Sequence, residues 1–223
     1  MKALDLFCGA GGATKGLQQA GFHVTGVDIK PQPRYCGDLF VQADALKPPF
    51  NLSDFDFMWA SPPCQAYSIM KNLPWVKKVQ HPMLIDATRE MLKSSGQHWV
   101  IENVMGAKLP ANYLCGGMFK KPFYRHRAFE TSFYWLRPGH PPHRNSIRNG
   151  RMLGSRARDI VHNGMPEMKL RHGKGATVDL VKKAFDVDWM TQAELTQAIP
   201  PAYSEYIGRA ALKFIERAAG DVA

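Results

Sequence analysis

Residues 2–28 read KALDLFCGAGGATKGLQQAGFHVTGVD, and this stretch determines the fold class. Its apolar start, residues 2–7, predicts a strand, which a glycine-rich turn joins to a helix over about residues 13–19. Residues 22–27 predict the next strand, which closes with Asp28. The order strand, glycine turn, helix, strand, acid is the first unit of a nucleotide-binding βαβ fold. We therefore predict an α/β protein.

The glycine turn, residues 8–12 (CGAGG), differs from the dinucleotide-binding pattern G-x-G-x-x-G, because Thr14 occupies the position of the last glycine. A pyrophosphate site is therefore not well supported. The glycines would let a ligand lie close to the backbone, while Asp28 accepts hydrogen bonds from a ribose diol. This combination suits S-adenosylmethionine, which has a ribose and no phosphate, and a plain tight βα turn is the alternative.

A second carboxylate follows the third predicted strand, residues 40–43, at Asp44. It stands one unit after Asp28 and could accept a hydrogen bond from an adenine amino group. An N-cap or a turn aspartate is the alternative, and for a single residue it is the more common one.

Residues 55–68 (FDFMWASPPCQAYS) carry the most reactive side chain of the chain. The apolar run 55–60 predicts a short buried strand, which stops at Pro62 because proline cannot donate to a sheet. Cys64 follows on a stiff loop, and ligands of open α/β sheets lie outside the carboxyl ends of the strands. Cys64 is therefore a candidate nucleophile, with an inert buried cysteine as the alternative.

The next segment repeats the arrangement of an acid after a strand. Residues 83–94, opened by Pro82, predict a helix, because their apolar positions form one face with a period of 3.6. The strand 99–101 then ends in Glu102 and Asn103, the same structural position as Cys64. Glu102 is either an acid-base group or a cap for the next element.

Residues 114–119 predict a turn and a strand, and residues 124–130 predict a further strand. Alternation along that strand would place Arg125 and Arg127 on one face. Two aligned guanidinium groups could clamp a phosphate or a base carbonyl, and solvated surface charge is the alternative.

The composition predicts one sizeable domain. The 223 residues are 45% apolar and 22% charged, which is ordinary globular usage. No apolar run approaches the roughly 20 residues of a membrane span, and the first residues enter a strand without room for a signal peptide. The four cysteines include no C-x-x-C pair, which argues against a zinc site and a disulfide framework. We expect no metal and a reducing, cytoplasmic protein.

The net charge of +10 is concentrated in one segment, residues 137–183. This segment has 11 lysines and arginines against three acids, so it carries +8 of the total. A basic block on a nearly neutral body indicates a polyanionic partner, with nucleic acid as the best candidate. The alternative is a loop that its charge keeps solvated.

A compact pattern resumes after residue 183. Thr191 is a good N-cap, and Glu194 three residues later completes a capping box. The prolines at 200 and 201 break this helix, and residues 203–217 predict a last amphipathic helix.

Taken together, these motifs resemble those of the DNA (cytosine-5) methyltransferase family. Residues 5–12 (DLFCGAGG) resemble its first motif, which holds S-adenosylmethionine, and 62–65 (PPCQ) resemble its catalytic Pro-Cys loop. Residues 102–104 (ENV) resemble its E-N-V motif, and 125–127 (RHR) the R-x-R part of its Q-x-R-x-R motif. Residues 197–210 are similar to its closing motif, whose loop returns to the cofactor.

The matches occur in family order over about residues 1–136 and 184–217. The resemblance implies a Rossmann-like S-adenosylmethionine-dependent methyltransferase sheet with helices on both faces, plus a small basic insert. We expect a catalytic S-adenosylmethionine-binding domain at 1–136, a short target-recognition-like insert at 137–183, and a segment returning to the catalytic domain at 184–223.

The chain departs from the family pattern in three places. Phe123 stands where the family has the Gln of Q-x-R-x-R, and the arginine-rich ninth motif is hardly recognisable before Asp188. The variable recognition region is reduced to the short insert. Small members of this pattern are often phage-borne, so the resemblance implies a bacterial cell or a phage-infected host.

The resemblance also implies the roles of individual residues. Cys64 would attack C6 of cytosine, Glu102 would donate a proton toward N3, and Arg127 would hold the base carbonyl O2. Arg125, Asn103 and Pro63 would support this catalytic site. S-adenosylmethionine would contact Phe7, Gly9, Ala10, Gly11, Gly12, Asp28, Ile29, Asp44, Ala45 and Pro62. DNA would contact Gln65, Arg148, Arg151, Arg156 and Arg158.

The implied partner is DNA, expected to be double-stranded with the target base flipped out of the stack. Protection against restriction is one candidate purpose. A cytosine C5 methyltransferase acting on RNA or a free nucleotide is an alternative with the same chemistry. A catalytically idle DNA-binding homologue is the alternative from a different class.

Overall fold

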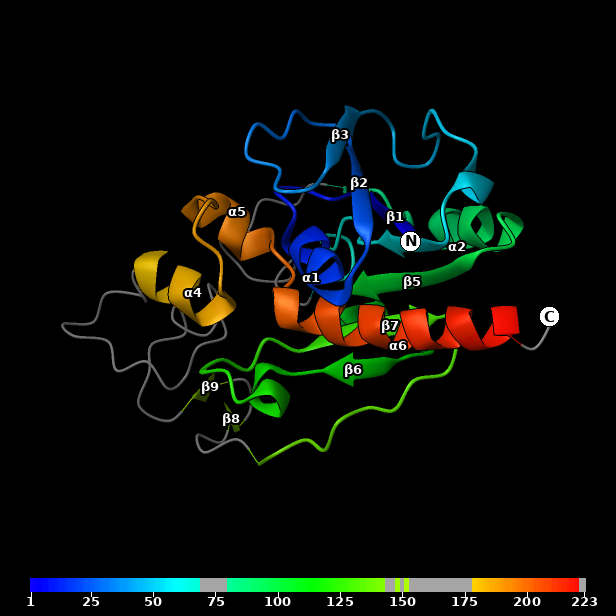
Figure 1. Cartoon of the computed structure of the whole chain (residues 1–223). Helices are drawn as coiled ribbons and strands as arrows, with labels where there is room; N and C mark the ends of the chain where they lie inside the picture. Colours follow the sequence, from blue (N-terminus) through cyan, green and yellow to red (C-terminus); the bar gives the residue numbers. More distant parts are fainter. Residues whose placement is uncertain (69–79, 143–146, 149–150, 153–177, 221–223) are drawn as a thin grey trace.

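The computed structural model describes residues 1–68, 80–142, 147–148, 151–152 and 178–220. Its centre is a seven-stranded sheet with the strand order β3-β2-β1-β4-β5-β7-β6 (Figure 1). The strands are β1 (Lys2–Leu6), β2 (His23–Asp28), β3 (Leu39–Gln42), β4 (Phe57–Ala60), β5 (His98–Asn103), β6 (Asn112–Leu114) and β7 (Arg127–Thr131).

The first five strands are parallel, so their carboxyl ends meet at one edge of the sheet. The register sets Leu6 of β1 beside Val27 of β2 and beside Ala60 of β4. Strand β7 runs antiparallel to β5, and β6 runs antiparallel to β7. Because of this reversal, the first residue of β7, Arg127, lies at the same edge as the end of β5.

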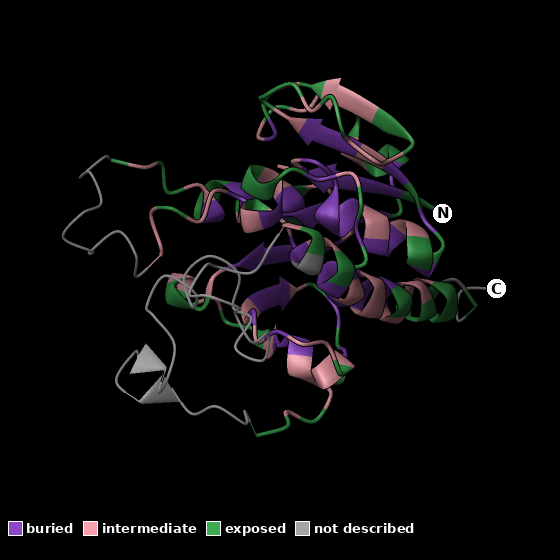
Figure 2. Cartoon of the chain, turned by 90° about the vertical axis from the view of Figure 1, so that its left-hand side faces the viewer, coloured by how far each residue is buried: buried purple, intermediate pink, exposed green. Residues whose placement is uncertain are grey.

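Helices cover both faces of the sheet, as the sequence predicts. On one face α1 (Gly12–Ala20) packs against α6 (Pro201–Gly220), and the two helices lie side by side in Figure 1. On the other face lies α2 (Ile85–Ser94). Alternate strand residues enter the two cores, so Val100 joins the core of the first face and Ile101 that of the second. Figure 2 shows the buried residues concentrated in the strands and on the inner sides of the helices.

A glycine in α1 allows the close approach of the start of α6. A Cβ at Gly16 would lie 2.1 Å from both the Pro201 carbonyl oxygen and Ser204 Oγ. Only a residue without a side chain lets the start of α6 approach α1 this closely. The C-terminal helix is thereby fixed directly on the helix that follows the glycine turn.

Three predicted elements need correction. Helix α2 begins at Ile85 and not at residue 83, because the Leu84 carbonyl accepts the first helical hydrogen bond, and Met83 is exposed. After β6 the chain forms a 3₁₀ turn, η4 (Gly116–Phe119), where the sequence predicted a strand. Strand β7 begins only at Arg127, which is where its pairing with β6 starts.

The C-terminal region carries α4 (Val178–Phe185) and α5 (Gln192–Gln197). The predicted capping box is confirmed, because Thr191 Oγ1 accepts from the Glu194 amide and the Glu194 carboxylate accepts from the Thr191 amide. Helix α4 spans the predicted end of the insert at residue 183 and contributes Phe185 to the core.

Two short strands lie within the predicted insert, β8 (Ile147–Arg148) and β9 (Arg151–Met152), paired antiparallel with Arg148 opposite Arg151. Arg156 and Arg158 lie outside the described residues. Two further 3₁₀ turns are η1 (Leu52–Asp54) and η3 (Met105–Ala107). Within the described part of the chain, no helix is both long enough and apolar enough for a membrane crossing.

Candidate active site at the carboxyl edge of the sheet

The loop that carries Cys64 is fixed on both sides of its prolines. All four residues of β4 are buried, and the Ser61 amide that follows them donates to the Leu6 carbonyl. The Asn103 side-chain amide donates to the Pro62 carbonyl over 2.9 Å. This bond ties the end of β5 to the loop after β4. Cys64 then opens a turn, since its carbonyl accepts from the amides of residues 67 and 68.

The Cys64 side chain is half-buried, and the next residue, Gln65, is exposed. The thiol is therefore at the boundary between the protein and solvent. The two prolines restrict the backbone before it, and the Asn103 bond restricts it further. A thiol in this position is held in place while it stays accessible to a ligand at the carboxyl edge.

Glu102 and Arg127 form an ion pair beside this loop. Arg127 Nε lies 3.0 Å from Glu102 Oε1, without the alignment of a hydrogen bond, and the two side chains are only 16% and 5% exposed. The pairing follows from the sheet, because β5 ends and antiparallel β7 begins at the same edge. Arg127 also donates through Nη1 to the His126 carbonyl.

Burial raises the pKa of the Glu102 carboxyl, while Arg127, Arg125 and a hydrogen bond with Ser61 oppose the shift. Burial also raises the pKa of the Cys64 thiol, which Arg127 lowers and the charge of Glu102 raises further. The two acids are thus coupled. A proton on Glu102 removes a negative charge that disfavours the Cys64 thiolate.

Arg125 lies before β7 and does not share a strand face with Arg127, so the predicted two-arginine clamp is wrong. Its guanidinium is buried and donates to the carbonyls of Leu195 and Thr196, in the last turn of α5. A cation is favourable at a helix C-terminus, where carbonyls have no helical partner. Burial and the charge of Arg127 lower the pKa of Arg125 to about 9.

The other half of the edge consists mostly of backbone. Gly9 has a φ of +52°, and a Cβ built on it would meet nothing within 4 Å. The Gly9 amide donates to Asp28 Oδ2 over 3.0 Å, and the Lys30 amide donates to Asp28 Oδ1. Phe7 adopts a φ of +61°, which is uncommon outside glycine and typical of functional sites. The turn therefore presents open space beside a fixed carboxylate.

Two neighbouring strand ends complete this half. Ile29 follows Asp28, and 67% of its large apolar side chain is exposed. After β3, Asp44 is exposed and accepts from the Leu46 amide, which is the turn geometry that the sequence left as the alternative. Ala45 beside it is buried. An exposed apolar side chain flanked by two carboxylates can contact one flat face and several polar atoms of a ligand.

Comparison with known proteins assigns the chain to a family. The model of the C-5 cytosine-specific DNA methylase family matches residues 1–121, more than half of the chain. The chain belongs to this family. The matched part contains the glycine turn, the Cys64 loop and Glu102, and it ends before Arg125 and Arg127.

Solved structures show the same fold over the whole chain. A putative DNA modification methyltransferase encoded within an E. coli prophage is 15% identical, with a TM-score of 0.60, and 97% of this chain covers 99% of that one. The Dnmt2 methyltransferase of S. pombe is 13% identical, with a TM-score of 0.55, and 96% of this chain covers 98% of that one. Among curated protein sequences, none matches. Over nearly the whole of its length the chain therefore has the fold of these two methyltransferases.

The family departure at Phe123 has a packing reason. Phe123 is fully buried, and its ring centroid lies 4.7 Å from that of Phe185 in α4. A Cβ at Gly116 would also lie 2.2 Å from the Phe123 carbonyl. The position that is polar in the family is part of the hydrophobic core of this chain.

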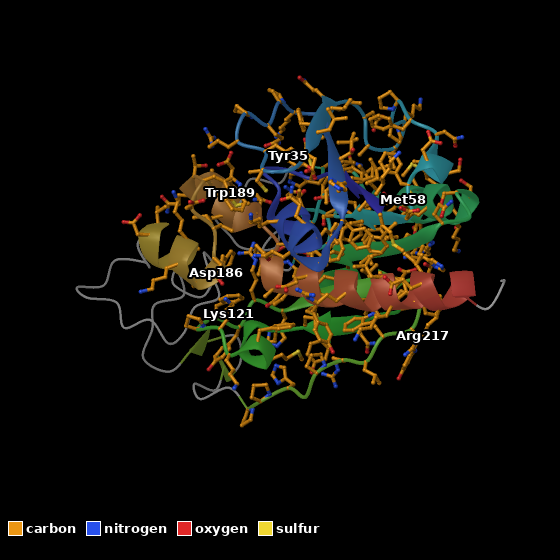
Figure 3. The ribbon with its side chains drawn as sticks, viewed as in Figure 1. Tyr35, Met58, Lys121, Asp186, Trp189 and Arg217 are labelled. Atoms are coloured by element: carbon orange, nitrogen blue, oxygen red, sulfur yellow. The ribbon has the colours of Figure 1, made fainter. Side chains whose placement is uncertain are left out.

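Sequence reasoning missed the residues that hold the glycine turn from outside. Trp189 Nε1 donates to the Ala10 carbonyl over 2.8 Å, and Cys36 Sγ donates to the Gly11 carbonyl. The Thr14 hydroxyl lies within hydrogen-bond distance of the Tyr35 hydroxyl, so Tyr35 and Trp189 reach the start of α1 from distant parts of the chain (Figure 3). Two of these long-range contacts go to backbone carbonyls and one joins two side chains, and a sequence pattern carries no signal for them.

Proposed function

We propose that this methylase transfers a methyl group from S-adenosylmethionine to C5 of cytosine in DNA, through a covalent bond between Cys64 and C6. The observation that carries the proposal is the position of Cys64, on a loop fixed by Asn103 and electrostatically coupled to the buried Glu102–Arg127 pair. The family membership supports the same reaction.

The chemistry of cytosine explains why a thiol is needed. C5 is too weak a nucleophile to take a methyl group directly, and attack of the Cys64 thiolate at C6 makes C5 enamine-like. This covalent step divides one difficult reaction into two easier ones. After methyl transfer, loss of the C5 proton and elimination of Cys64 restore the ring double bond and the enzyme.

Glu102 and Arg127 would balance the charge during the attack. Protonated Glu102 donates toward N3 of the ring, so that negative charge does not accumulate when the thiolate adds. The raised pKa of Glu102, caused by its burial, favours the protonated form that this role requires. Arg127 would donate to the base carbonyl O2. Arg125 acts at a distance, because its guanidinium is already held by α5.

The half of the carboxyl edge around β1 and β2, which we call the glycine half, fits S-adenosylmethionine. The open space at Gly9 admits a ligand against the backbone, Asp28 can accept from ribose hydroxyls, and exposed Ile29 can cover the adenine. Asp44 stands at the next strand end. The bound cofactor supplies an electrophilic methyl group, and these residues orient it toward the Cys64 half of the edge.

DNA is the proposed substrate because of the basic insert and the depth of the site. The Glu102–Arg127 pair is nearly buried, so a base inside a duplex cannot reach it without leaving the stack. Gln65 lies exposed beside Cys64, where it can contact the strand around the flipped base. The insert, with a net charge of +8, would neutralise phosphates.

The substrate class is tested by measuring methyl transfer from labelled S-adenosylmethionine to matched duplex DNA, single-stranded DNA, RNA and free cytidine nucleotides. We expect label in duplex DNA, recovered as 5-methylcytosine after digestion. Label found in RNA alone would show that the same reaction takes place on RNA and not on DNA. Label in none of them would favour an idle DNA-binding homologue.

The role of the insert is tested by the salt dependence of duplex binding. Replacing Arg148, Arg151, Arg156 and Arg158 with Gln should reduce the slope of log K against log salt by about 0.9 for each lost phosphate contact. Replacing four exposed residues of the opposite edge (Lys2, Asp54, Lys93 and Arg217) should leave the slope near its original value. An unchanged slope in the insert variant would remove the insert from the DNA interface.

A further inference from the structure

Three potential metal ligands lie close together where β6 ends and β7 begins, at the carboxyl edge of the sheet. Cys115 follows β6 directly, His126 precedes β7 directly, and His140 lies on the segment after β7. The antiparallel register pairs Leu114 with Arg127, so it brings the neighbouring Cys115 and His126 together. No sequence motif marks this cluster, because the three residues are 11 and 14 positions apart and form no C-x-x-C pair.

The distances fit a small cation. One ligand atom from each residue lies within 4.8 Å of the others, and His126 Nε2 lies 3.2 Å from His140 Nε2. Zinc takes histidine nitrogens at about 2.0–2.1 Å in tetrahedral sites, which separates two such nitrogens by about 3.3 Å. The two imidazoles therefore already have the spacing of two ligands on one ion.

We propose that Cys115, His126 and His140 form a Zn²⁺ site, in which a water takes the fourth tetrahedral position. One thiolate and two imidazoles are a donor set that suits zinc. The site is distinct from the Cys64 loop, and it does not depend on the proposed methyl transfer.

A backbone amide contacts the Cys115 sulfur. The Gly117 amide donates to the Cys115 thiol from within the same turn. The Gly116 backbone lies against Phe123, where any side chain would collide with the Phe123 carbonyl. This close approach returns the chain from Cys115 to His126. An amide that donates to the sulfur from two residues ahead is a feature expected of a metal-ligating cysteine.

The surroundings of the two histidines also restrict their rings. The ring centroid of Tyr113 lies 5.8 Å from that of His126 and 5.7 Å from that of His140. The two imidazoles stack with 29° between their planes. A cluster that faces two ring nitrogens toward each other in this way requires either a shared hydrogen bond or a shared cation.

The function of such an ion would be structural. It would join the end of β6, the start of β7 and the segment that leads into the basic insert. The His126 carbonyl accepts from Arg127 Nη1, so the ion would also fix the backbone that orients the partner of Glu102. It would take no part in the chemistry.

The first test measures metal content in the full chain, produced without a histidine tag and dialysed against zinc and then against metal-free buffer. We expect about one zinc per chain, by mass spectrometry of the metal. His140→Ala should lose this zinc, whereas the matched control His23→Ala, an exposed histidine on β2, should keep it. Zinc that is absent from the wild-type chain, or retained in full by His140→Ala, would overturn the proposal.

The second test reads the ligand set directly and begins with the wild-type chain. The wild-type chain loaded with Co²⁺ should show the intense visible bands of tetrahedral cobalt and a thiolate-to-cobalt charge-transfer band. Cys115→Ser should lose the charge-transfer band, and the control Cys36→Ser should retain it. A weak octahedral spectrum without charge transfer in the wild type would reduce the cluster to a hydrogen-bonded histidine pair.

Discussion

The two halves of the carboxyl edge are built on different physical principles. Around β1 and β2 the site is shaped by missing side chains, because Gly9 leaves open space and its amide fixes the Asp28 carboxylate. Around β4, β5 and β7 it is shaped by buried charge, with Glu102 and Arg127 nearly removed from solvent. The difference teaches that the first half is suited to binding a ligand and the second to changing protonation states.

Two buried carboxylates show the same contrast. Asp5 in β1 is fully buried and accepts from the Thr14 hydroxyl over 2.6 Å, and no ion pair is found for it among the described residues. Burial raises its pKa to about 7. Glu102 is as deeply buried, but Arg127 and Arg125 oppose the effect of burial on its pKa. Burial therefore raises the pKa of both carboxyls, and the opposing influence is a hydrogen bond with Thr14 for Asp5 and two nearby guanidinium groups for Glu102.

The largest expected effect is in the half of the edge around β4, β5 and β7, which we call the charged half. Cys64→Ala should abolish methyl transfer and leave duplex binding nearly intact, because the variant loses the nucleophile and keeps the basic surface. Initial rates with labelled S-adenosylmethionine measure the loss. Residual turnover above about one percent would contradict the nucleophile role.

The next effect concerns the general acid. Glu102→Gln should lower kcat by roughly 10²-fold, because glutamine keeps the size of the side chain and cannot transfer a proton. Cofactor affinity should stay near its original value, since Glu102 belongs to the charged half. The measurement is kcat under saturating DNA together with a cofactor titration. An unchanged kcat would exclude Glu102 as the proton donor.

A matched pair of glycines tests whether the glycine half binds the cofactor. Gly9→Ala and Gly96→Ala both place a Cβ in open space at a positive φ, +52° and +72°, so each should cost about 1 kcal/mol of stability. Only Gly9 lies at the carboxyl edge, since Gly96 stands before β5. We expect about tenfold weaker cofactor binding for Gly9→Ala alone, by calorimetry. Equal affinity in both variants would contradict the assignment of the glycine half.

The last prediction concerns stability and pH and leaves the chemistry of the site untouched. Asp5 keeps its proton in the native state up to about pH 7, whereas the unfolded chain loses it near its ordinary pKa of 3.8. The contribution of Asp5 to the free energy of unfolding is therefore complete below pH 3.8. It is lost as the pH rises to about 7, by up to about 1.4 kcal/mol per pH unit.

Asp5→Asn removes the titrating group and keeps an acceptor for Thr14. Urea unfolding at several pH values should show a difference between variant and wild type that grows in favour of the variant from acid to neutral pH. A difference that is constant across this range would show that Asp5 titrates normally.

Much of the fold could be predicted from the sequence because its signals are local. The glycine turn, the strand that ends at Ala60, and the Thr191–Glu194 capping box each depend on residues close in sequence. The parallel arrangement follows from the βαβ order. The candidate nucleophile and acid could be placed at one edge, because both follow strands of the same sheet.

The rest depends on tertiary partners that no local pattern reveals. Arg125 leaves the predicted strand because the carbonyls at the end of α5 offer its guanidinium a better partner than solvent. Trp189 reaches Ala10 across most of the chain. The Cys115–His126–His140 cluster exists only because β6 and β7 pair, so spacing rules for zinc could not find it.

The central claim is that Cys64 forms a covalent bond with the cytosine ring, and one measurement tests it most directly. Duplex DNA containing 5-fluorocytosine is incubated with the full chain and S-adenosylmethionine, because fluorine at C5 cannot leave as a proton does. We predict an adduct that survives denaturing electrophoresis, requires the cofactor, and maps to the peptide containing Cys64. Methyl transfer to ordinary duplex DNA without any adduct on the fluorinated duplex would contradict the covalent mechanism.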